Sequence, residues 1–155
     1  MREADRRGTA RLQEIQREFR GKVERYLDQG AGACHLRRPA IAGLVAETLQ
    51  HFDQTRYLLH DWVIMPNHVH TLVFPRPNHL LSDILKSWKQ FTSRRPKALL
   101  AISGKPFWQR ECYDHWVRSE QEQARISSYI RSNPVRAGLC DTPEEWRWSS
   151  AWRTV

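Results

Sequence analysis

Hydrophobic residues in the first third of the chain recur every three or four positions. One such stripe runs through residues 10–29 and is followed by glycines, which predicts an amphipathic helix that ends there. A second stripe begins after Pro39 and stops near Asp53, which predicts a second helix. Residues 1–9 precede both stripes, and we expect them to be disordered.

The hydrophobic pattern changes to that of a β-hairpin in the middle of the chain. Residues 55–65 are rich in strand formers, Pro66 and Asn67 form a turn, and residues 68–74 alternate as a second strand. Because side chains alternate between the faces of a strand, one face of the second strand carries His68, His70, Leu72 and Phe74.

A third helix is predicted after the hairpin. Ser82 can cap it, and Pro96 lies within its pattern. Its apolar stripe consists of Leu81, Ile84, Leu85, Trp88 and Phe91. The aromatic and β-branched residues of 107–117 then predict a third strand.

A fourth helix is predicted from a capping box formed by Ser119 and Glu122, and we expect it to stop at Pro134. One face of this helix carries Ile126, Tyr129, Ile130 and Asn133. The mixed order of helices and strands, without repeats or linkers, predicts a single α+β domain over residues 1–155.

Composition excludes several classes of protein. Hydrophobic residues make up 40% of the chain and charged residues 27%, but no apolar run approaches the roughly 20 residues that span a bilayer. The chain opens without a secretory signal, so we expect a cytoplasmic protein with no membrane partner. Its three cysteines lack the paired spacing of zinc or redox sites.

The net charge of +8 is concentrated in one part of the chain. Residues 86–136 contain eleven Lys and Arg against four Asp and Glu, a net of +7. A concentrated basic stretch attracts polyanions, of which nucleic acid is the most common. General solubility or weak membrane attraction would explain the charge equally well without a site.

Two histidines separated by one residue on a strand can hold one metal ion, and His68 and His70 have this spacing. A buried Asn133 would need a partner for its amide, because an unpaired amide costs about 1 to 3 kcal/mol. A metal ion bound by both histidines would supply that partner. Taken separately, each residue has a structural alternative: a hydrogen-bonded histidine pair, a core tyrosine, or an Asn before a Pro that ends a helix.

Transfer of a DNA strand onto tyrosine is the chemistry that unites these residues. A phenol is a weak nucleophile at neutral pH, so Tyr129 would need a phosphate polarised by a divalent cation. The proposed ligands are His68, His70 and Asn133. Tyr113 is a rival nucleophile that lacks an amide one helical turn away.

Five motifs in order resemble the REP-associated tyrosine transposases, a branch of the single-tyrosine HUH transposases. They are WVIMPNHVH, KSWKQFT, FWQRE, YIRSNPVRAGL and WRWSSAW, within residues 33–152. The resemblance implies a bacterial source and a ferredoxin-like antiparallel sheet with helices packed on it. It also implies Mg²⁺ or Mn²⁺ at His68, His70 and Asn133, with Tyr129 as the catalytic residue. These donors would also accept Zn²⁺ or Ni²⁺.

One part of the family pattern is absent from residues 1–10. Relatives open with a strand that lies beside the histidine strand, and nothing there resembles it. Either the start is assigned too far downstream, or the fold lacks this first strand and leaves the histidine strand at an edge.

The expected partner is single-stranded or hairpin DNA, and self-association is not predicted. The candidate phosphate contacts are Lys86, Lys89, Arg94, Arg95, Arg110, Arg118, Arg131 and Arg136. An exposed Trp88 or Trp116 could stack on an unpaired base, although the core is the more common place for each.

Three functions are compatible with the sequence. The first is a transposase that nicks and rejoins single-stranded DNA at palindromic repeat hairpins through a 5′-phosphotyrosine. The second is a non-catalytic binding protein for single strands or hairpins, derived from such an enzyme. The third is a metal-dependent phosphodiesterase that uses water.

Overall fold

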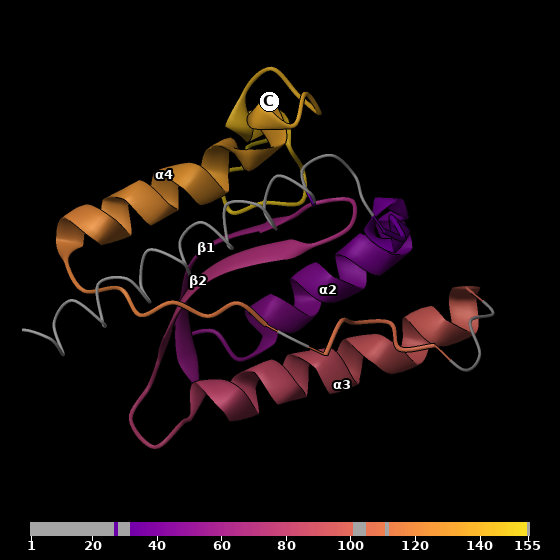
Figure 1. Cartoon of the computed structure of the whole chain (residues 1–155), viewed down its shortest axis with the longest axis horizontal. Helices are drawn as coiled ribbons and strands as arrows, with labels where there is room; N and C mark the ends of the chain where they lie inside the picture. Colours follow the sequence, from indigo (N-terminus) through magenta and orange to yellow (C-terminus); the bar gives the residue numbers. More distant parts are fainter. Residues whose placement is uncertain (1–26, 28–31, 101–104, 111, 155) are drawn as a thin grey trace, which may run out of the picture.

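An antiparallel hairpin lies at the centre of the structure, a computed structural model that describes residue 27 and residues 32–100, 105–110 and 112–154, the side chains of 97–99 excepted. Strand β1 (Tyr57–Ile64) pairs with β2 (Val69–Pro75), with helices on either side (Figure 1). The predicted hairpin is confirmed. A register shift between Leu59 and Asp61 marks a bulge in β1.

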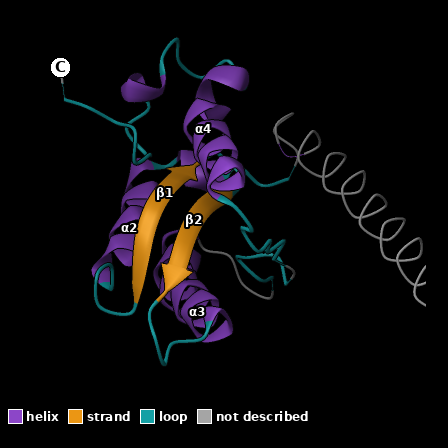
Figure 2. Cartoon of the chain, turned by 90° about the vertical axis from the view of Figure 1, so that its left-hand side faces the viewer, coloured by secondary structure: helices purple, strands orange, loops and turns teal. Residues whose placement is uncertain are grey.

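Helices α2 (Pro39–His51) and α3 (Leu81–Leu100) cover one face of the hairpin, behind both strands in Figure 2. The main hydrophobic core lies between these two helices and the hairpin. The Tyr57 hydroxyl donates to the Leu49 carbonyl at 2.8 Å and accepts from Trp88 Nε1 at 3.0 Å, so the core's polar atoms are paired. The larger apolar residues of this core are Ile41, Val45, Leu49, Tyr57, Ile64, Ile84 and Trp88.

Helix α4 (Glu120–Arg136) covers the opposite face of the hairpin, in front of the strands in Figure 2. The Ser119 hydroxyl accepts a hydrogen bond from the Glu122 N–H at 3.1 Å, which confirms the predicted N-terminal cap. A smaller apolar cluster joins the helix to the strands and consists of Val63, Met65, Leu72 and Ile130.

The prediction that α4 stops at Pro134 was wrong. The helix continues to Arg136, although Pro134 has no N–H to donate within it. Gly138, two residues after the end of the helix, has a φ of +67° that favours glycine, and the N–H groups of Gly138 and Leu139 donate to the carbonyls of Val135 and Pro134. Glycine at the left-handed position therefore ends the helix, and proline does not.

The predicted strand over residues 107–117 was also wrong, because none of its described residues lies in a strand. Side chains from α3 hold this segment instead of a neighbouring strand. Lys89 Nζ donates to the carbonyls of Gln109 and Arg110 at 2.8 and 3.3 Å, and Trp108 Nε1 donates to the Thr92 hydroxyl at 2.7 Å. Aromatic and β-branched composition favoured a strand, but among the described residues no strand pairs with this segment.

The free edge of β1 is occupied by the end of the chain. After the short 3₁₀ turn η2 (Pro143–Glu145), the Ser150 N–H donates to the Trp62 carbonyl at 2.9 Å, and Trp148 accepts from the Ile64 N–H at 2.8 Å. A second 3₁₀ turn, η1 (His35–Arg37), precedes α2.

The α+β class and the antiparallel sheet with packed helices are confirmed. Within the described residues the sheet has two strands. The predicted helix over residues 10–29 and the expected disorder of residues 1–9 lie outside the described residues, apart from the helical Leu27. None of the described helices is both long and apolar enough to cross a membrane.

A buried carboxylate connects α4 and the C-terminal segment to β1. Asp61, 7% exposed, accepts hydrogen bonds from the hydroxyls of Ser127 at 2.5 Å and Ser150 at 3.0 Å, and its Oδ2 lies 2.7 Å from His60 Nδ1. Burial by itself would raise the pKa of Asp61, but the hydrogen bonds from Ser127, His60 and Ser150 outweigh it and lower the pKa below its ordinary value.

Asp61→Asn is expected to lower the free energy of unfolding by about 1.5 to 3 kcal/mol at pH 7, because it removes charge-assisted hydrogen bonds. The folded-state pKa of Asp61 lies below that of the unfolded chain, about 3.9. This stabilisation is therefore present above that value and is lost as the pH falls through the folded-state pKa. Urea unfolding at several pH values measures the difference from wild type.

Asp141→Asn, at an exposed position, is the matched control and is expected to change stability little. Equal losses in Asp61→Asn and Asp141→Asn at pH 7 would contradict the role assigned to the Asp61 network.

Candidate functional site

His68 and His70 converge at the turn end of the hairpin. Their Nε2 atoms lie 3.0 Å apart, and the planes of their rings are nearly perpendicular, at 85°. His68, just before β2, is 8% exposed, and His70, on β2, is partly buried. The structure therefore brings the two predicted imidazoles together with the same nitrogen of each ring turned toward a common point.

Asn67 fixes the orientation of His68. The Asn67 Nδ2 group donates to the Leu27 carbonyl at 2.8 Å, so the amide oxygen faces His68 Nδ1, 2.7 Å away. That oxygen can only accept, so His68 carries its proton on Nδ1 and leaves the lone pair on Nε2. Sequence reasoning assigned Asn67 only to the turn. Its place directly before the first histidine was the available signal.

The environment keeps His70 uncharged at neutral pH. Burial, followed by the neighbouring charges of His68 and Arg136, lowers the pKa of His70 to about 3. A neutral imidazole has a lone pair available, which is the form that binds metal ions.

Tyr129 of α4 lies against this pair of histidines. The centroids of the Tyr129 and His70 rings are 5.5 Å apart, with the planes at 78°. The guanidinium carbon of Arg136, seven residues further along α4, lies 4.8 Å from the centroid of the Tyr129 ring. The phenol is therefore flanked by an imidazole and a cation.

Asn133 lies one helical turn after Tyr129 and is 1% exposed. Neither polar atom of its amide has a hydrogen-bond partner among the described residues. An unpaired buried amide costs about 1 to 3 kcal/mol, and its oxygen is a suitable ligand for a hard divalent cation.

The available donors fit a divalent ion only if an amide takes part. In the described part of the chain, no group of three or more His, Cys, Asp and Glu is arranged to hold a metal. Two imidazole nitrogens and the amide oxygen of Asn133 form a donor set that first-row divalent ions accept. The buried amide of Asn133, which has no hydrogen-bond partner among the described residues, is the structural observation that supports this donor set.

Most of the predicted phosphate contacts are exposed, and they come from several elements of the fold. Lys89 Nζ donates hydrogen bonds to the carbonyls of Gln109 and Arg110, and Arg136 lies beside Tyr129. Five others come from α3, from the segment after it and from the residue before the Ser119 cap, and Arg131 lies on α4. The remaining exposed set is Lys86, Arg94, Arg95, Arg110, Arg118 and Arg131.

The aromatic side chains differ from the predicted pattern at two positions, because both Trp116 and Phe91 were expected in the core. Trp88 is in the core, 8% exposed, whereas Trp116 is 71% exposed. Phe91 was predicted to belong to the buried stripe of its helix, and this was wrong because it is 59% exposed.

Comparison with known proteins decides the family. The family model described as "Transposase IS200 like" matches residues 37–133, which include the histidine pair, Tyr129 and Asn133. The chain belongs to the IS200-like transposase family. The family predicted from the sequence motifs is thereby confirmed.

Curated relatives share somewhat more than a quarter of their aligned residues with this transposase-family chain. A "Putative REP-associated tyrosine transposase" of Haemophilus influenzae is 29% identical over 105 residues, 59% of this chain and 57% of the relative. The REP-associated tyrosine transposase of Escherichia coli is 28% identical over 102 residues, 63% of this chain and 56% of the relative. The aligned part thus spans somewhat more than half of each relative.

A solved structure of a REP-associated tyrosine transposase bound to a REP hairpin has a similar fold. It aligns with a TM-score of 0.56 and 19% sequence identity, over 71% of this chain and 62% of that one.

Asn133→Leu is expected to raise the free energy of unfolding by about 1 to 3 kcal/mol in EDTA, because an apolar side chain of similar size removes the unpaired amide. Urea unfolding followed by circular dichroism measures the change.

Thr92→Val is the matched control at a buried polar residue whose hydroxyl is paired. It accepts from Trp108 Nε1 and donates to the Trp88 carbonyl, so the variant is expected to be less stable than wild type. A loss of stability in Asn133→Leu similar to that in Thr92→Val would show that the amide is paired in the metal-free protein.

Proposed function

We propose that this chain is a metal-dependent DNA strand transferase that nicks and rejoins single-stranded DNA through Tyr129. The observation that carries the proposal is the meeting of two elements. The ring of Tyr129 from α4 lies 5.5 Å from that of His70, whose Nε2 is 3.0 Å from the Nε2 of His68. Membership of the IS200-like transposase family supports the same reaction.

In the proposed reaction the phenolic oxygen of Tyr129 attacks the scissile phosphorus. A phosphorus–oxygen bond to Tyr129 forms, and the bond to the 3′ oxygen of the preceding nucleotide breaks. The phenol loses its proton and the departing oxygen gains one, so a 5′-phosphotyrosine and a free 3′-hydroxyl result. A 3′-hydroxyl of a second strand can reverse the step without an external energy source.

His68, His70 and Asn133 would hold a divalent ion, Mg²⁺ or Mn²⁺ by family resemblance, which polarises the phosphate when bound. Arg136 brings a positive charge beside the attacking phenol, where the non-bridging phosphate oxygens would lie. Asn67 holds His68 with its Nε2 lone pair turned toward His70.

We propose hairpin-bearing single-stranded DNA as the substrate class. The neighbour in the structural comparison was solved with a REP hairpin, and the exposed Lys and Arg residues of the basic segment supply phosphate contacts.

A covalent adduct tests the reaction. The purified chain, incubated with 5′- or 3′-labelled single-stranded DNA containing a REP-like hairpin and Mn²⁺, is expected to give a denaturation-resistant adduct with the fragment 3′ of the cut. Tyr129→Phe should lose the adduct by at least about 100-fold, because it removes the nucleophile. Denaturing gel electrophoresis measures the yield.

Tyr113→Phe is the matched control, since Tyr113 is the alternative phenol and is 49% exposed. It should keep the adduct. Cleavage of both fragments without an adduct would instead indicate a hydrolase that uses water. DNA binding without cleavage, unchanged by chelator and by His68→Ala, would indicate a binding protein.

Asn67→Ala is expected to weaken binding of Mn²⁺ by about 10- to 100-fold, because the ring of His68 loses the acceptor that fixes its tautomer. Isothermal titration calorimetry with Mn²⁺ alone measures the affinity. Asn67→Asp keeps an acceptor for His68 Nδ1 and should retain most of the affinity for Mn²⁺. Equal Mn²⁺ affinities in Asn67→Ala and wild type would remove Asn67 from the metal site.

A further inference from the structure

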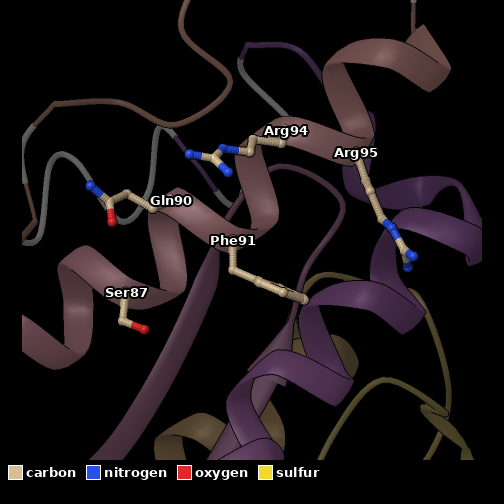
Figure 3. Close-up of a pocket in the computed structure, with 5 residues that line it drawn as sticks. All are labelled: Ser87, Gln90, Phe91, Arg94 and Arg95. Carbon is tan, nitrogen blue, oxygen red and sulfur yellow. The ribbon is translucent and has the colours of Figure 1, made fainter.

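An exposed phenylalanine with basic neighbours lies on α3, on the other side of the sheet from α4. Phe91 is 59% exposed at the rim of a hollow of about 390 Å³. In Figure 3 its ring projects between Gln90 and Arg94 on one side and Arg95 on the other. The hollow is lined by Ser87, Gln90, Phe91, Arg94 and Arg95.

A second hollow of about 730 Å³ adjoins the first, because Arg95 lines both. It lies between α2, α3 and the C-terminal segment and includes Arg147. The guanidinium carbon of Arg147 lies 5.0 Å from the ring centroid of Trp148, and a Cβ on Gly43 would be only 3.7 Å from the ring of Trp148. Trp148 thus packs against α2, and the guanidinium group of Arg147 lies near its ring.

The two hollows share Arg95, and we call the residues Gln90, Phe91, Arg94, Arg95 and Arg147 the α3 strip. Among the described residues that line the hollows, three are arginines and one, Glu47, is acidic. The second hollow is also lined by apolar residues, among them Pro39, Leu44 and Trp148. In Figure 3 the side chains of Arg94 and Arg95 extend in different directions, so their charges lie on two sides of Phe91 and attract a polyanion.

We infer that the α3 strip binds single-stranded DNA, with an unpaired base stacked on Phe91 and phosphates on Arg94, Arg95 and Arg147. An exposed aromatic ring stacks on a base only where that base has left the duplex, and arginines follow the backbone on either side. Gln90 can hydrogen-bond an edge of the same base.

The α3 strip contacts a part of the DNA other than the one that is cut. The histidine pair and Tyr129 lie between the strands and α4, whereas α3 and α2 cover the opposite face. A strand held by the α3 strip therefore flanks the cleaved segment. This inference deepens the proposed function and rests on it for the identity of the ligand as DNA.

Fluorescence anisotropy with labelled oligothymidylate in EDTA tests the α3 strip without cleavage. Phe91→Ala is expected to raise the Kd by about 5- to 150-fold, the equivalent of one stacked base. Phe91→Trp should restore binding. Arg94→Gln should reduce the dependence of log K on log salt concentration by about 0.7, the value for one phosphate contact to a single strand.

Leu80→Ala and Arg76→Gln are the matched controls, because Leu80 is 65% exposed and Arg76 is an exposed arginine outside the hollows. Both should bind oligothymidylate nearly as wild type does. The inference is overturned if Phe91→Ala binds as Leu80→Ala does, or if Phe91→Ala weakens binding to a blunt duplex as much as to the single strand.

The two proposals can fail separately. If Tyr129→Phe loses the covalent adduct but binds oligothymidylate normally, the result supports a cleavage site that is separate from the α3 strip. If no adduct forms in wild type but Phe91→Ala still weakens binding, the α3 strip stands and the proposed reaction fails. If Tyr129→Phe behaves as predicted and Phe91→Ala binds normally, only the α3 strip is rejected.

Discussion

The hydrogen bonds of Asp61 connect the two halves of the candidate site. His68 and His70 belong to the hairpin, whereas Tyr129 and Asn133 belong to a helix that follows about sixty residues later in the chain. Ser127, two residues before Tyr129, donates to the carboxylate of Asp61 on β1, and Ser150 donates to its other oxygen. A charged acceptor with low solvent exposure fixes both donors in direction, so it holds α4 in register with the strands.

The two faces of the hairpin contact different parts of the protein, because side chains alternate between the faces along β2. Val69 and Val73 pack into the large apolar core beneath α2 and α3, while His70 and Leu72 face α4. The large core stabilises the hairpin independently of the site. The opposite face can therefore tolerate a buried amide without a partner and an uncharged histidine, features that lower stability in the absence of a ligand.

This division also places the two proposed DNA-binding sites on two sides of the molecule. The proposed nucleophile lies next to a cation, Arg136, on the α4 side, and the α3 strip carries Phe91 with its arginines on the other. A single strand is flexible enough to pass around the edge of a small sheet, whereas a duplex is stiff over this length. Two separate contacts on one strand would raise its affinity by effective concentration and hold the cleaved segment in position.

The sequence alone predicted the hairpin, the positions of three helices and the family, because each depends on local periodicity or on motifs of fixed spacing. It also predicted which face of β2 carries the histidines. Tertiary structure decided the rest: Gly138 rather than Pro134 ends α4, α3 side chains replace the expected strand at 107–117, and Phe91 faces solvent. The contacts of Asn67 with Leu27 and of Asp61 with Ser127 and Ser150 were beyond the sequence because these partners lie 40 or more residues away, and no local pattern encodes which distant groups a fold brings within hydrogen-bond distance.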